Sequence, residues 1–295
     1  MRKPVQVLAE GLGHPEGPCV LPDGRVAFAN TYNSEIAVWD PARGTSRYGF
    51  TGGGPNACML GTDGYLYCTN CPTVGKWSAP ERRPPSIQRV APDGRAEIVA
   101  TSADGIALNA PNDLTFGPDG RLYFTDSGDW DPVAKPHPGY ICAIDADGTA
   151  HVLEELEPVY PNGIVAEPDG AILWVESYTR RLIRRTPDGR KTLLHTLPEG
   201  HIPDGFKIDA AGNLWITAFG AGGVDIVRAD GTPLDFLETG GVPLNCAFGG
   251  TDLYVCDFGT TVTADATPMG GRLLKVAVGV AGMTLFQGAI GGAGR

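Results

Sequence analysis

The sequence has little of what marks several classes of protein. Its 295 residues carry 23 lysines and arginines against 34 aspartates and glutamates, a formal net charge of −11. Nucleic acids and anionic membranes attract basic surfaces, so this balance argues against both as partners. No apolar run approaches the ~18 residues that span a bilayer. The opening MRKPVQVLAEGLG also lacks the apolar stretch of a signal peptide, and we expect a cytoplasmic protein.

Disulfide bonds are not expected either. The seven cysteines are an odd number with scattered spacing, which favours reduced and mostly buried thiols. Cys68 and Cys71 form a C-x-x-C pair, but no second pair follows it. A zinc or redox role is therefore less favoured than a plain pair at the end of a strand.

Helical periodicity over ten or more residues is absent, whereas turn residues are plentiful. The 42 glycines and 25 prolines are spread along the chain rather than gathered in a linker. This distribution is typical of many short strands joined by tight turns. Hydrophobic residues make up 42% of the chain, which is enough for a large buried core. We predict an all-β fold.

Two phrases alternate along the chain. The first is a tight turn followed by a strand that ends in a small polar group, and its six copies are LPDGRVAFAN, GTDGYLYCTN, GPDGRLYFTD, EPDGAILWVES, DAAGNLWITAF and GGTDLYVCDF. The second phrase is another strand that runs into another turn, as in IQRVAPDG and LIRRTPDG. Such internal repetition is the signature of a repeat architecture.

A short motif with an oxygen-bearing side chain precedes each copy of the first phrase. The motifs are HPEGP, GPNAC, APNDL, YPNGI, IPDGF and PLNCA, and we call their central residues the marker residues: Glu16, Asn56, Asn112, Asn162, Asp204 and Asn245. They recur every 40 to 56 residues, a length typical of a four-stranded propeller blade. We predict one domain over residues 1–295, a six-bladed β-propeller with about four antiparallel strands per blade.

A terminal strand is expected to close the ring. VQVLAEG near the N-terminus resembles the strands that precede later marker residues, although GMTLF near the C-terminus competes for the same place. Since each marker residue opens an innermost strand, all six are predicted at one face of the ring, around the central channel. The long connections 70–86, 126–138 and 258–270 return to that face and are candidate walls of a site.

Six oxygen donors directed into one channel indicate a hard divalent cation. Calcium is the first candidate, and Mn²⁺, Zn²⁺, Mg²⁺ and Fe²⁺ are alternatives. Asparagine and aspartate often only cap turns. Six such residues at equivalent positions, the first of them a glutamate between two prolines, favour a metal site instead.

The motifs also carry a resemblance to a known family. HPEGP, PNDLTFGPDGRLYFTD, YPNGIVAEPDG, PDGFKIDAAGNLWITAF and NCAFGGTDLYVCDF resemble, in this order and over nearly the whole chain, the family of senescence marker protein 30, gluconolactonase and related lactonases. The resemblance implies a calcium-dependent six-bladed propeller hydrolase. Glu16, Asn162 and Asp204 match the metal ligands of the family, and Asn112 matches a position that binds metal or substrate. Ala110 stands where the sugar-lactonase branch often has an arginine.

The expected reaction is hydrolysis of a small lactone, a sugar lactone or a related one, through a metal-polarised carbonyl and an activated water. Asp204 matches the residue proposed as general base in the family, while Asp113 or a metal-bound hydroxide are alternatives. Asn56, Asn112, Asp113 and His201 are the predicted substrate-binding residues. The expected state is a monomer or a weak homo-oligomer.

Three other functions stay open on the sequence alone. A phosphotriester or aryl ester hydrolase would use the same metal site. A non-catalytic propeller would bind a ligand around a structural metal. A lyase resembling strictosidine synthase would share the fold without needing a metal. Folds host many functions, so the choice depends on the marker residues rather than on the propeller.

Overall fold

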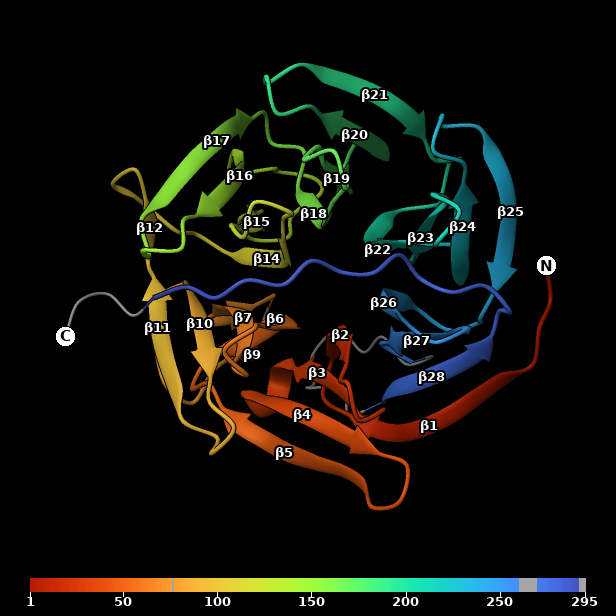
Figure 1. The fold of residues 1–295 in the computed structure, drawn as a ribbon, viewed down its shortest axis with the longest axis horizontal. Helices are drawn as coiled ribbons and strands as arrows, with labels where there is room; N and C mark the ends of the chain where they lie inside the picture. The colour runs from red at the N-terminus through yellow and green to blue at the C-terminus, as the bar shows by residue number, and fades with distance from the viewer. Residues whose placement is uncertain (76, 260–269, 292–295) are drawn as a thin grey trace.

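Short strands account for nearly all the regular structure of residues 1–75, 77–259 and 270–291, which the computed structural model describes. Six four-stranded antiparallel sheets surround a central axis, so the predicted six-bladed propeller is confirmed (Figure 1). From the innermost strand outward, the first three blades are β2 (Pro15–Val20), β3 (Val26–Asn30), β4 (Glu35–Asp40) and β5 (Gly44–Phe50); β6 (Gly54–Leu60), β7 (Leu66–Cys71), β10 (Ser86–Val90) and β11 (Ala96–Ala100); β14 (Pro111–Phe116), β15 (Leu122–Asp126), β16 (Gly139–Ile144) and β17 (Ala150–Leu156).

The other three blades repeat this plan. They are β18 (Pro161–Ala166), β19 (Ile172–Glu176), β20 (Arg181–Arg185) and β21 (Lys191–Thr196); β22 (Pro203–Ile208), β23 (Leu214–Ala218), β24 (Gly223–Val227) and β25 (Pro233–Glu238); β26 (Pro243–Gly249), β27 (Asp252–Asp257), β28 (Gly271–Ala277) and β1 (Val5–Leu12). Two small hairpins, β8 (Thr73–Val74) with β9 (Trp77–Ser78) and β12 (Ser102–Ala103) with β13 (Ile106–Ala107), and a 3-10 turn η1 (Thr31–Asn33) complete the regular elements.

A terminal strand closes the ring, as predicted, and it is the N-terminal one. β1 pairs antiparallel with β28, from Val5 opposite Val276 to Leu12 opposite Gly271. The first strand of the chain therefore forms the outer edge of the last blade. The competing segment GMTLF takes no part in that sheet and makes only single bridges elsewhere, Gly282 to Asp209 and Phe286 to Phe116.

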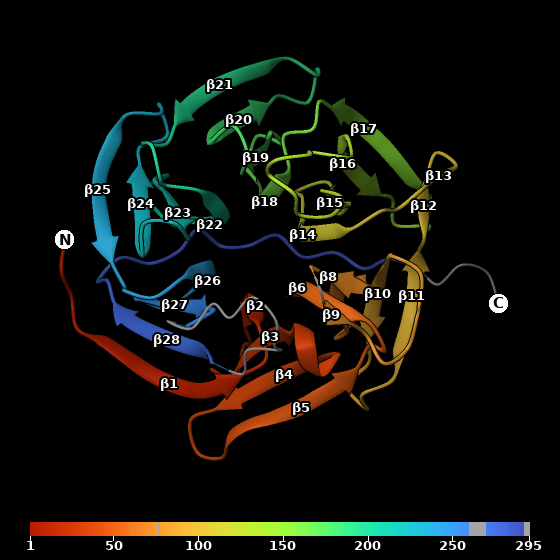
Figure 2. The ribbon, with the colours of Figure 1, turned by 180° about the vertical axis from the view of Figure 1, so that it is seen from behind.

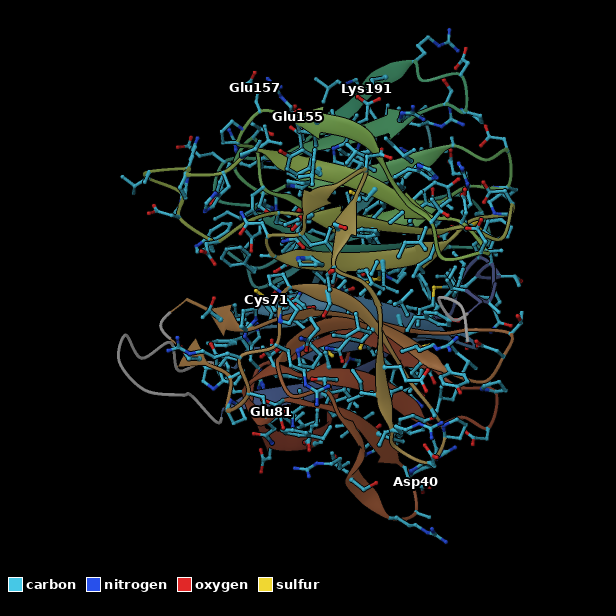
Figure 3. The ribbon with its side chains drawn as sticks, turned by 90° about the vertical axis from the view of Figure 1, so that its left-hand side faces the viewer. Asp40, Cys71, Glu81, Glu155, Glu157 and Lys191 are labelled. Atoms are coloured by element: carbon cyan, nitrogen blue, oxygen red, sulfur yellow. The ribbon has the colours of Figure 1, made fainter. Side chains whose placement is uncertain are left out.

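The Asp–Gly turns lie on one face of the ring, which we call the turn face. In the first of them Gly24 adopts φ +85°, a conformation that favours glycine, and its N–H donates to the Leu21 carbonyl at 2.9 Å. Asp23 accepts the N–H of Arg25 at 3.1 Å, so the turn is satisfied within itself. In the side view, Asp40 and Lys191 lie toward this face, whereas Cys71 and Glu157 lie toward the opposite one (Figure 3).

The hydrophobic core lies between the blades. Six clusters of buried side chains are found in the described part of the chain, one at each junction between neighbouring blades. Tyr67 of the second blade meets Phe116 of the third edge-to-face at 5.3 Å, and Trp174 is fully buried at the next junction. Burial at about 25 cal/mol per Å² of apolar surface makes these junctions the main source of stability.

The small polar residues that end the second strands tie each blade to the next. The hydroxyl of Thr69 donates to the Asn112 carbonyl at 2.7 Å, and that of Thr125 donates to the Asn162 carbonyl at 2.8 Å. Thr217 donates in the same way to the Leu244 carbonyl at 2.7 Å. These bonds, each worth about 1 kcal/mol, fix the backbone of the innermost strands where the marker residues lie.

After β28 the chain crosses the turn face. Residues 279–291, which we call the strap, run across the middle of the ring and are seen from both sides in Figures 1 and 2. Met283 N–H donates to the Ile208 carbonyl at 2.9 Å, and Thr62 N–H donates to the Gly288 carbonyl at 2.9 Å. Ile290, 1% exposed, packs into the core between the second and third blades. The strap thus bridges opposite sides of the ring.

All seven cysteines are buried and free, as predicted. Among the described residues, no helix has both the length and the apolar character that crossing a membrane requires. Of the three long connections predicted to wall the site, residues 260–269 lie outside the described part of the chain.

Candidate functional site

Five marker residues stand at one level around the channel. The proline before each of these five marker residues pairs with the last or the last but one residue of the second strand, as Pro15 does with Asn30 and Pro55 with Asn70. We call this end of the ring the marker face. Four of the five side chains are buried, Glu16 at 2%, Asn112 at 8%, Asn162 at 4% and Asp204 at 7% exposure. Asn56 is half-buried.

Asn245 is the exception to the predicted ring. In the sixth blade Pro243 pairs with Asp257, so Leu244 stands at the level of the other marker residues. Asn245 lies one residue deeper in the channel, level with Asp113. The sequence prediction of six equivalent positions is wrong here, because in PLNCA one residue separates the proline from the asparagine.

Glycines below the marker level let neighbouring strands approach one another closely. A Cβ added to Gly17 would lie 2.2 Å from the Cα of Ala57, and one added to Gly205 would lie 2.0 Å from Cγ of Asn245. Gly17 also adopts φ +42°. This explains the rigid Pro–Glu–Gly–Pro sequence around Glu16: the glycine seats the strand against the next blade, and the glutamate stays at the mouth of the channel.

Glu16 and Asp204 are acidic groups in an unfavourable electrostatic environment. Burial, followed by the charges of Asp204 and Asp113, raises the pKa of Glu16 well above its ordinary value, although the Gly17 N–H and the Asn245 amide oppose the rise. Burial and the charge of Asp113 raise the pKa of Asp204 in the same way. Among the described residues, the Asn162 amide is the one group that opposes this rise in Asp204. A cation between these carboxylates would relieve both effects.

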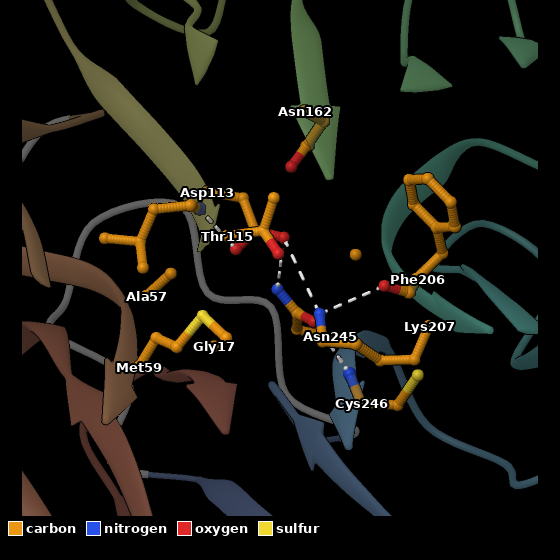
Figure 4. Close-up of polar contacts among 12 residues, drawn as sticks. Gly17, Ala57, Met59, Asp113, Thr115, Asn162, Phe206, Lys207, Asn245 and Cys246 are labelled. Carbon is orange, nitrogen blue, oxygen red and sulfur yellow. Dashed lines mark hydrogen bonds and ion pairs between the residues drawn. The ribbon is translucent and has the colours of Figure 1, made fainter. Parts of the chain in front are cut away.

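The side chain of Asn162 carries an oxygen with unused hydrogen-bonding capacity. Its Nδ2 donates to Ser177 Oγ at 3.2 Å, while its Oδ1 is buried and has no partner among the described residues. The oxygen points toward the middle of the group drawn in Figure 4. Since a buried oxygen without a partner costs about 1–3 kcal/mol, this atom is suited to a ligand.

These donors fit a hard cation. Glu16, Asp204 and Asn162 offer only oxygen, the ligand type that calcium prefers. No group of three or more His, Cys, Asp or Glu side chains placed to hold a metal is found in residues 1–75, 77–259 and 270–291, so two carboxylates would need amide oxygens beside them. Asn162 supplies one such oxygen.

A second polar group lies one residue deeper. Asp113, 2% exposed, accepts the Leu114 N–H at 2.7 Å and the Asn245 amide at 3.3 Å. The Lys207 ammonium lies 4.0 Å from the same Asp113 oxygen and donates to the Phe206 carbonyl at 3.0 Å (Figure 4). The oxygens of Asp113 are therefore engaged within the protein, unlike the Oδ1 of Asn162.

The remaining predicted substrate-binding positions divide into two sets. Asn56 donates its amide to the Asn112 side-chain oxygen at 3.1 Å, so these two neighbours lie together at the mouth. His201 instead bonds Asp225 at 2.9 Å and packs against Phe236. Its partners belong to the outer strands of the fifth blade, and the structure does not bring it to the group around Asp204.

Aromatic residues extend from the marker level to the surface. Burial and the Asp204 charge raise the pKa of Tyr160, and a hydrogen bond with Asn112 opposes the rise, which places its hydroxyl beside both groups. Its ring meets that of Trp130 edge-to-face at 4.8 Å, and Tyr178 lies 5.0 Å from Trp130. Trp130 is 39% exposed. These three rings form an aromatic wall on one side of the mouth.

His14 lies across the mouth from this wall. Its ring meets Tyr32 at 5.0 Å and Phe258 at 4.8 Å, both edge-to-face. Burial lowers the pKa of His14 to about 4, so the ring is neutral at pH 7. Its Nδ1 has no hydrogen-bond partner among the described residues.

Two residues of this region were missed in the sequence. Lys207 is a charged residue between the apolar Phe206 and Ile208 in the strand PDGFKI, and this break in pattern was a readable signal. The sequence signal for Tyr160 was weaker, because it consisted only of the position directly before Pro161. Its φ of +55° turns the chain at that point, which the sequence does not reveal.

Comparison with known proteins identifies relatives of the chain. The model of the SMP-30/gluconolactonase/LRE-like region matches residues 14–257. Among curated proteins, a gluconolactonase of Zymomonas mobilis is 26% identical over 292 aligned residues, which cover 85% of this chain and 78% of that protein.

Solved structures show the same fold. Regucalcin of Agrobacterium tumefaciens, described as a calcium-binding protein, superposes with a TM-score of 0.78 at 21% identity, covering 99% of this chain and 98% of that chain. A gluconolactonase of Xanthomonas campestris superposes with a TM-score of 0.72 at 20% identity, covering 95% and 89%.

Proposed function

Since this chain belongs to the SMP-30/gluconolactonase/LRE-like family, we propose that it is an enzyme that hydrolyses a lactone, a cyclic ester, with a divalent cation at the marker face. The curated gluconolactonase aligned over 85% of the chain supports the reaction class. The observation that carries the proposal is the meeting of two buried carboxylates, Glu16 and Asp204, with the unpartnered oxygen of Asn162.

Glu16, Asn162 and Asp204 would hold the cation, and Asn112 is a fourth candidate ligand through its side-chain oxygen. Calcium suits an all-oxygen set of this kind, and the calcium-binding regucalcin of the same fold supports that choice. When bound, such an ion supplies positive charge that polarises an ester carbonyl toward attack by water.

Asp204 is the better candidate for general base. Asp113 accepts a backbone N–H and an amide and faces Lys207, so its oxygens are committed. Asp204 has the Asn162 amide beside it and keeps acceptor capacity at the mouth. One of its oxygens would take a proton from the attacking water, whose oxygen bonds to the carbonyl carbon. As the ring C–O bond breaks, the same proton would pass to the departing alkoxide, giving a hydroxy acid.

Other residues would orient the substrate. The Tyr160 hydroxyl lies beside Asn112 and Asp204, where it could donate a hydrogen bond to a ring or carbonyl oxygen. Asn56 and Asn112 offer amides at the same rim. Trp130 presents an exposed aromatic face, against which a small ring can pack. The position of Ala110 leaves the rim without the arginine expected of a sugar lactonase.

The decisive experiment is a lactone hydrolysis assay on chelator-stripped protein. Aldonolactones and simple γ-lactones are tested with and without added Ca²⁺, Mn²⁺, Zn²⁺, Mg²⁺ and Fe²⁺, and acid release is followed with a pH indicator. We expect activity to vanish with the chelator and to return with one ion. Hydrolysis that persists after complete removal of divalent ions would contradict the proposed metal dependence. Absence of hydrolysis with every lactone would contradict the proposed reaction.

A further inference from the structure

A lysine is buried in the channel directly below the marker level. The side chain of Lys207, 12% exposed, extends from β22 toward Asp113 of β14, whose own side chain is 3% exposed. The ammonium and the carboxylate oxygen are 4.0 Å apart, and the Phe206 carbonyl accepts a hydrogen bond from the same ammonium at 3.0 Å (Figure 4). A buried ammonium requires a compensating negative charge.

The charges in this part of the channel can be counted. Among the described residues, the charges that raise the pKa of Glu16 are those of Asp204 and Asp113, and the charge that raises the pKa of Asp204 is that of Asp113. Three carboxylates are therefore involved: Glu16, Asp204 and Asp113. With all three ionised, the carboxylates contribute three negative charges. Lys207 contributes one positive charge beside Asp113, which leaves a sum of −2. A divalent cation would bring that sum to zero.

The hydrogen bonds divide the three carboxylates into two kinds. Asp113 accepts from Leu114 N–H and from the Asn245 amide and pairs with Lys207, so it is satisfied within the protein. Among the described residues, Glu16 accepts a hydrogen bond from the adjacent Gly17 N–H at 2.8 Å, and the Asn245 amide also favours its ionised form. Asp113 and Lys207 thus form an internal pair beneath the two carboxylates that face the mouth.

We propose that Lys207 is a fixed internal counter-charge that makes the site select a divalent ion over a trivalent one. The inference rests on the proposed metal site and concerns how its charge is set. Lys207 touches neither substrate nor ion in this assignment; it acts through Asp113 and is a positioning residue. Its neutral replacement leaves Asp113 as a third uncompensated negative charge, which attracts a trivalent ion more than a divalent one.

The test measures binding of two ions of similar size, Ca²⁺ and Tb³⁺, by calorimetry and by terbium luminescence sensitised by the nearby aromatic rings. In Lys207→Met we expect the affinity ratio of Tb³⁺ to Ca²⁺ to rise by about tenfold or more over the wild-type ratio. Asp113→Asn, which keeps the lysine, should move the ratio in the opposite direction. These shifts are read from binding alone, without any measurement of turnover.

A double variant and a matched lysine serve as controls. Lys207→Met combined with Asp113→Asn restores the sum of −2 and should return the ratio to near the wild-type value. Lys275 is also ion-paired, to Asp252 at 2.7 Å, but lies on β28 away from the channel. Lys275→Met changes the net charge of the protein equally and should leave the ratio unchanged. Lys207→Arg should keep it as well.

The outcomes distinguish failure of the role of Lys207 from failure of the proposed metal site. A wild-type ratio in Lys207→Met, or a double variant that behaves like the single one, overturns the role of Lys207 while leaving the metal site intact. A wild-type protein that binds neither ion rejects the metal site of the proposed function, and this inference with it. If circular dichroism shows that Lys207→Met does not fold, Lys207→Gln and Asp113→Asn carry the same test.

Discussion

The two faces of the propeller are built from the same strands but differ in how far their polar groups are hydrogen-bonded. On the turn face, aspartates such as Asp23 accept neighbouring backbone N–H groups, and the strap covers the middle of the ring. On the marker face, His14 Nδ1 and Asn162 Oδ1 are buried and have no partner among the described residues. Glu16 and Asp204 lie there under mutual repulsion.

This contrast indicates that the turn face serves mainly the stability of the fold and the marker face mainly its chemistry. Because these turns satisfy their own polar groups, the same Asp–Gly turn can recur in the first five blades. Unsatisfied groups on the marker face persist because the blade junctions hold them in place, and such groups concentrate at functional sites. Changes on the marker face should therefore affect turnover, and changes on the turn face should affect unfolding.

The largest effect is expected at the marker face. Asp204→Asn removes both a proposed ligand oxygen and the proposed base, and lactone hydrolysis should fall about 10³-fold or more. The thermal midpoint of the metal-free form should not fall, because a buried negative charge beside Glu16 and Asp113 is lost. Asp188→Asn, in an exposed turn of the other face, is the control and should hydrolyse like the wild type. Near-normal turnover in Asp204→Asn would refute its role.

Removal of the proposed metal should destabilise the marker face, and the size of this effect should depend on pH. The raised pKa values of Glu16 and Asp204 mean that the metal-free fold favours their protonated forms. That contribution to stability is present at low pH and is lost as the pH rises through the raised values. The proposed cation would compensate for the loss at neutral pH.

The thermal midpoint should accordingly differ by about 5–10 °C between loaded and chelated protein near pH 8, for an ion at about a hundredfold its Kd. The difference should shrink as the pH falls, because protonated carboxyls do not hold the ion. Scanning calorimetry at several pH values measures it. A difference that grows on acidification would contradict the assignment of these two carboxylates.

On the turn face, Ile290→Ala should lower the free energy of unfolding by about 2–3 kcal/mol, because it empties a buried site under the strap. Turnover of the folded enzyme should change less than about twofold. Val280, 39% exposed on the same strap, is the matched control, and Val280→Ala should cost under ~0.5 kcal/mol. Denaturant unfolding compares the two. Equal costs would show that the strap is not anchored at Ile290.

The smallest effect is expected at the aromatic wall. Trp130→Ala should raise KM by about fivefold, equivalent to ~1 kcal/mol of lost packing against substrate, with little change in the thermal midpoint. Val133→Ala in the same loop, where the side chain is 92% exposed, should change neither. A Trp130→Ala variant with unaltered KM and a lowered midpoint would assign this ring to the structure of its own loop.

The fold was predictable because its signals repeat. Each Asp–Gly turn and each apolar strand is a weak signal alone, but six copies fix the number of blades and the common face of their motifs. The likeness between VQVLAEG and other outer strands made β1 one of two candidates for closing the ring, and its pairing with β28 decides against GMTLF.

The site was predictable only in part. Glu16, Asn162 and Asp204 are governed by local motifs, and the structure brings them to one mouth. Asn245 moved one level deeper because a single additional residue after Pro243 shifts the register. His201 bonds Asp225 instead, because the side chain of a loop residue pairs with a neighbour that the fold brings close to it. Lys207 and Asp113 meet across the channel, and no sequence spacing encodes that distance.

The closure of the ring by β1 has a consequence for how the chain folds during synthesis. The strand that β1 needs as its partner, β28, spans residues 271–277, so about 260 residues of sequence separate the two halves of one sheet. Each of the first five blades is formed by one continuous segment of the chain and can assemble as it leaves the ribosome. The first strand, by contrast, must wait with its edge unpaired until the last blade emerges. Such long-range pairing is slow, and unpaired edges associate with other chains. Arrest of translation shortly before residue 271 would hold the molecule in its most aggregation-prone form.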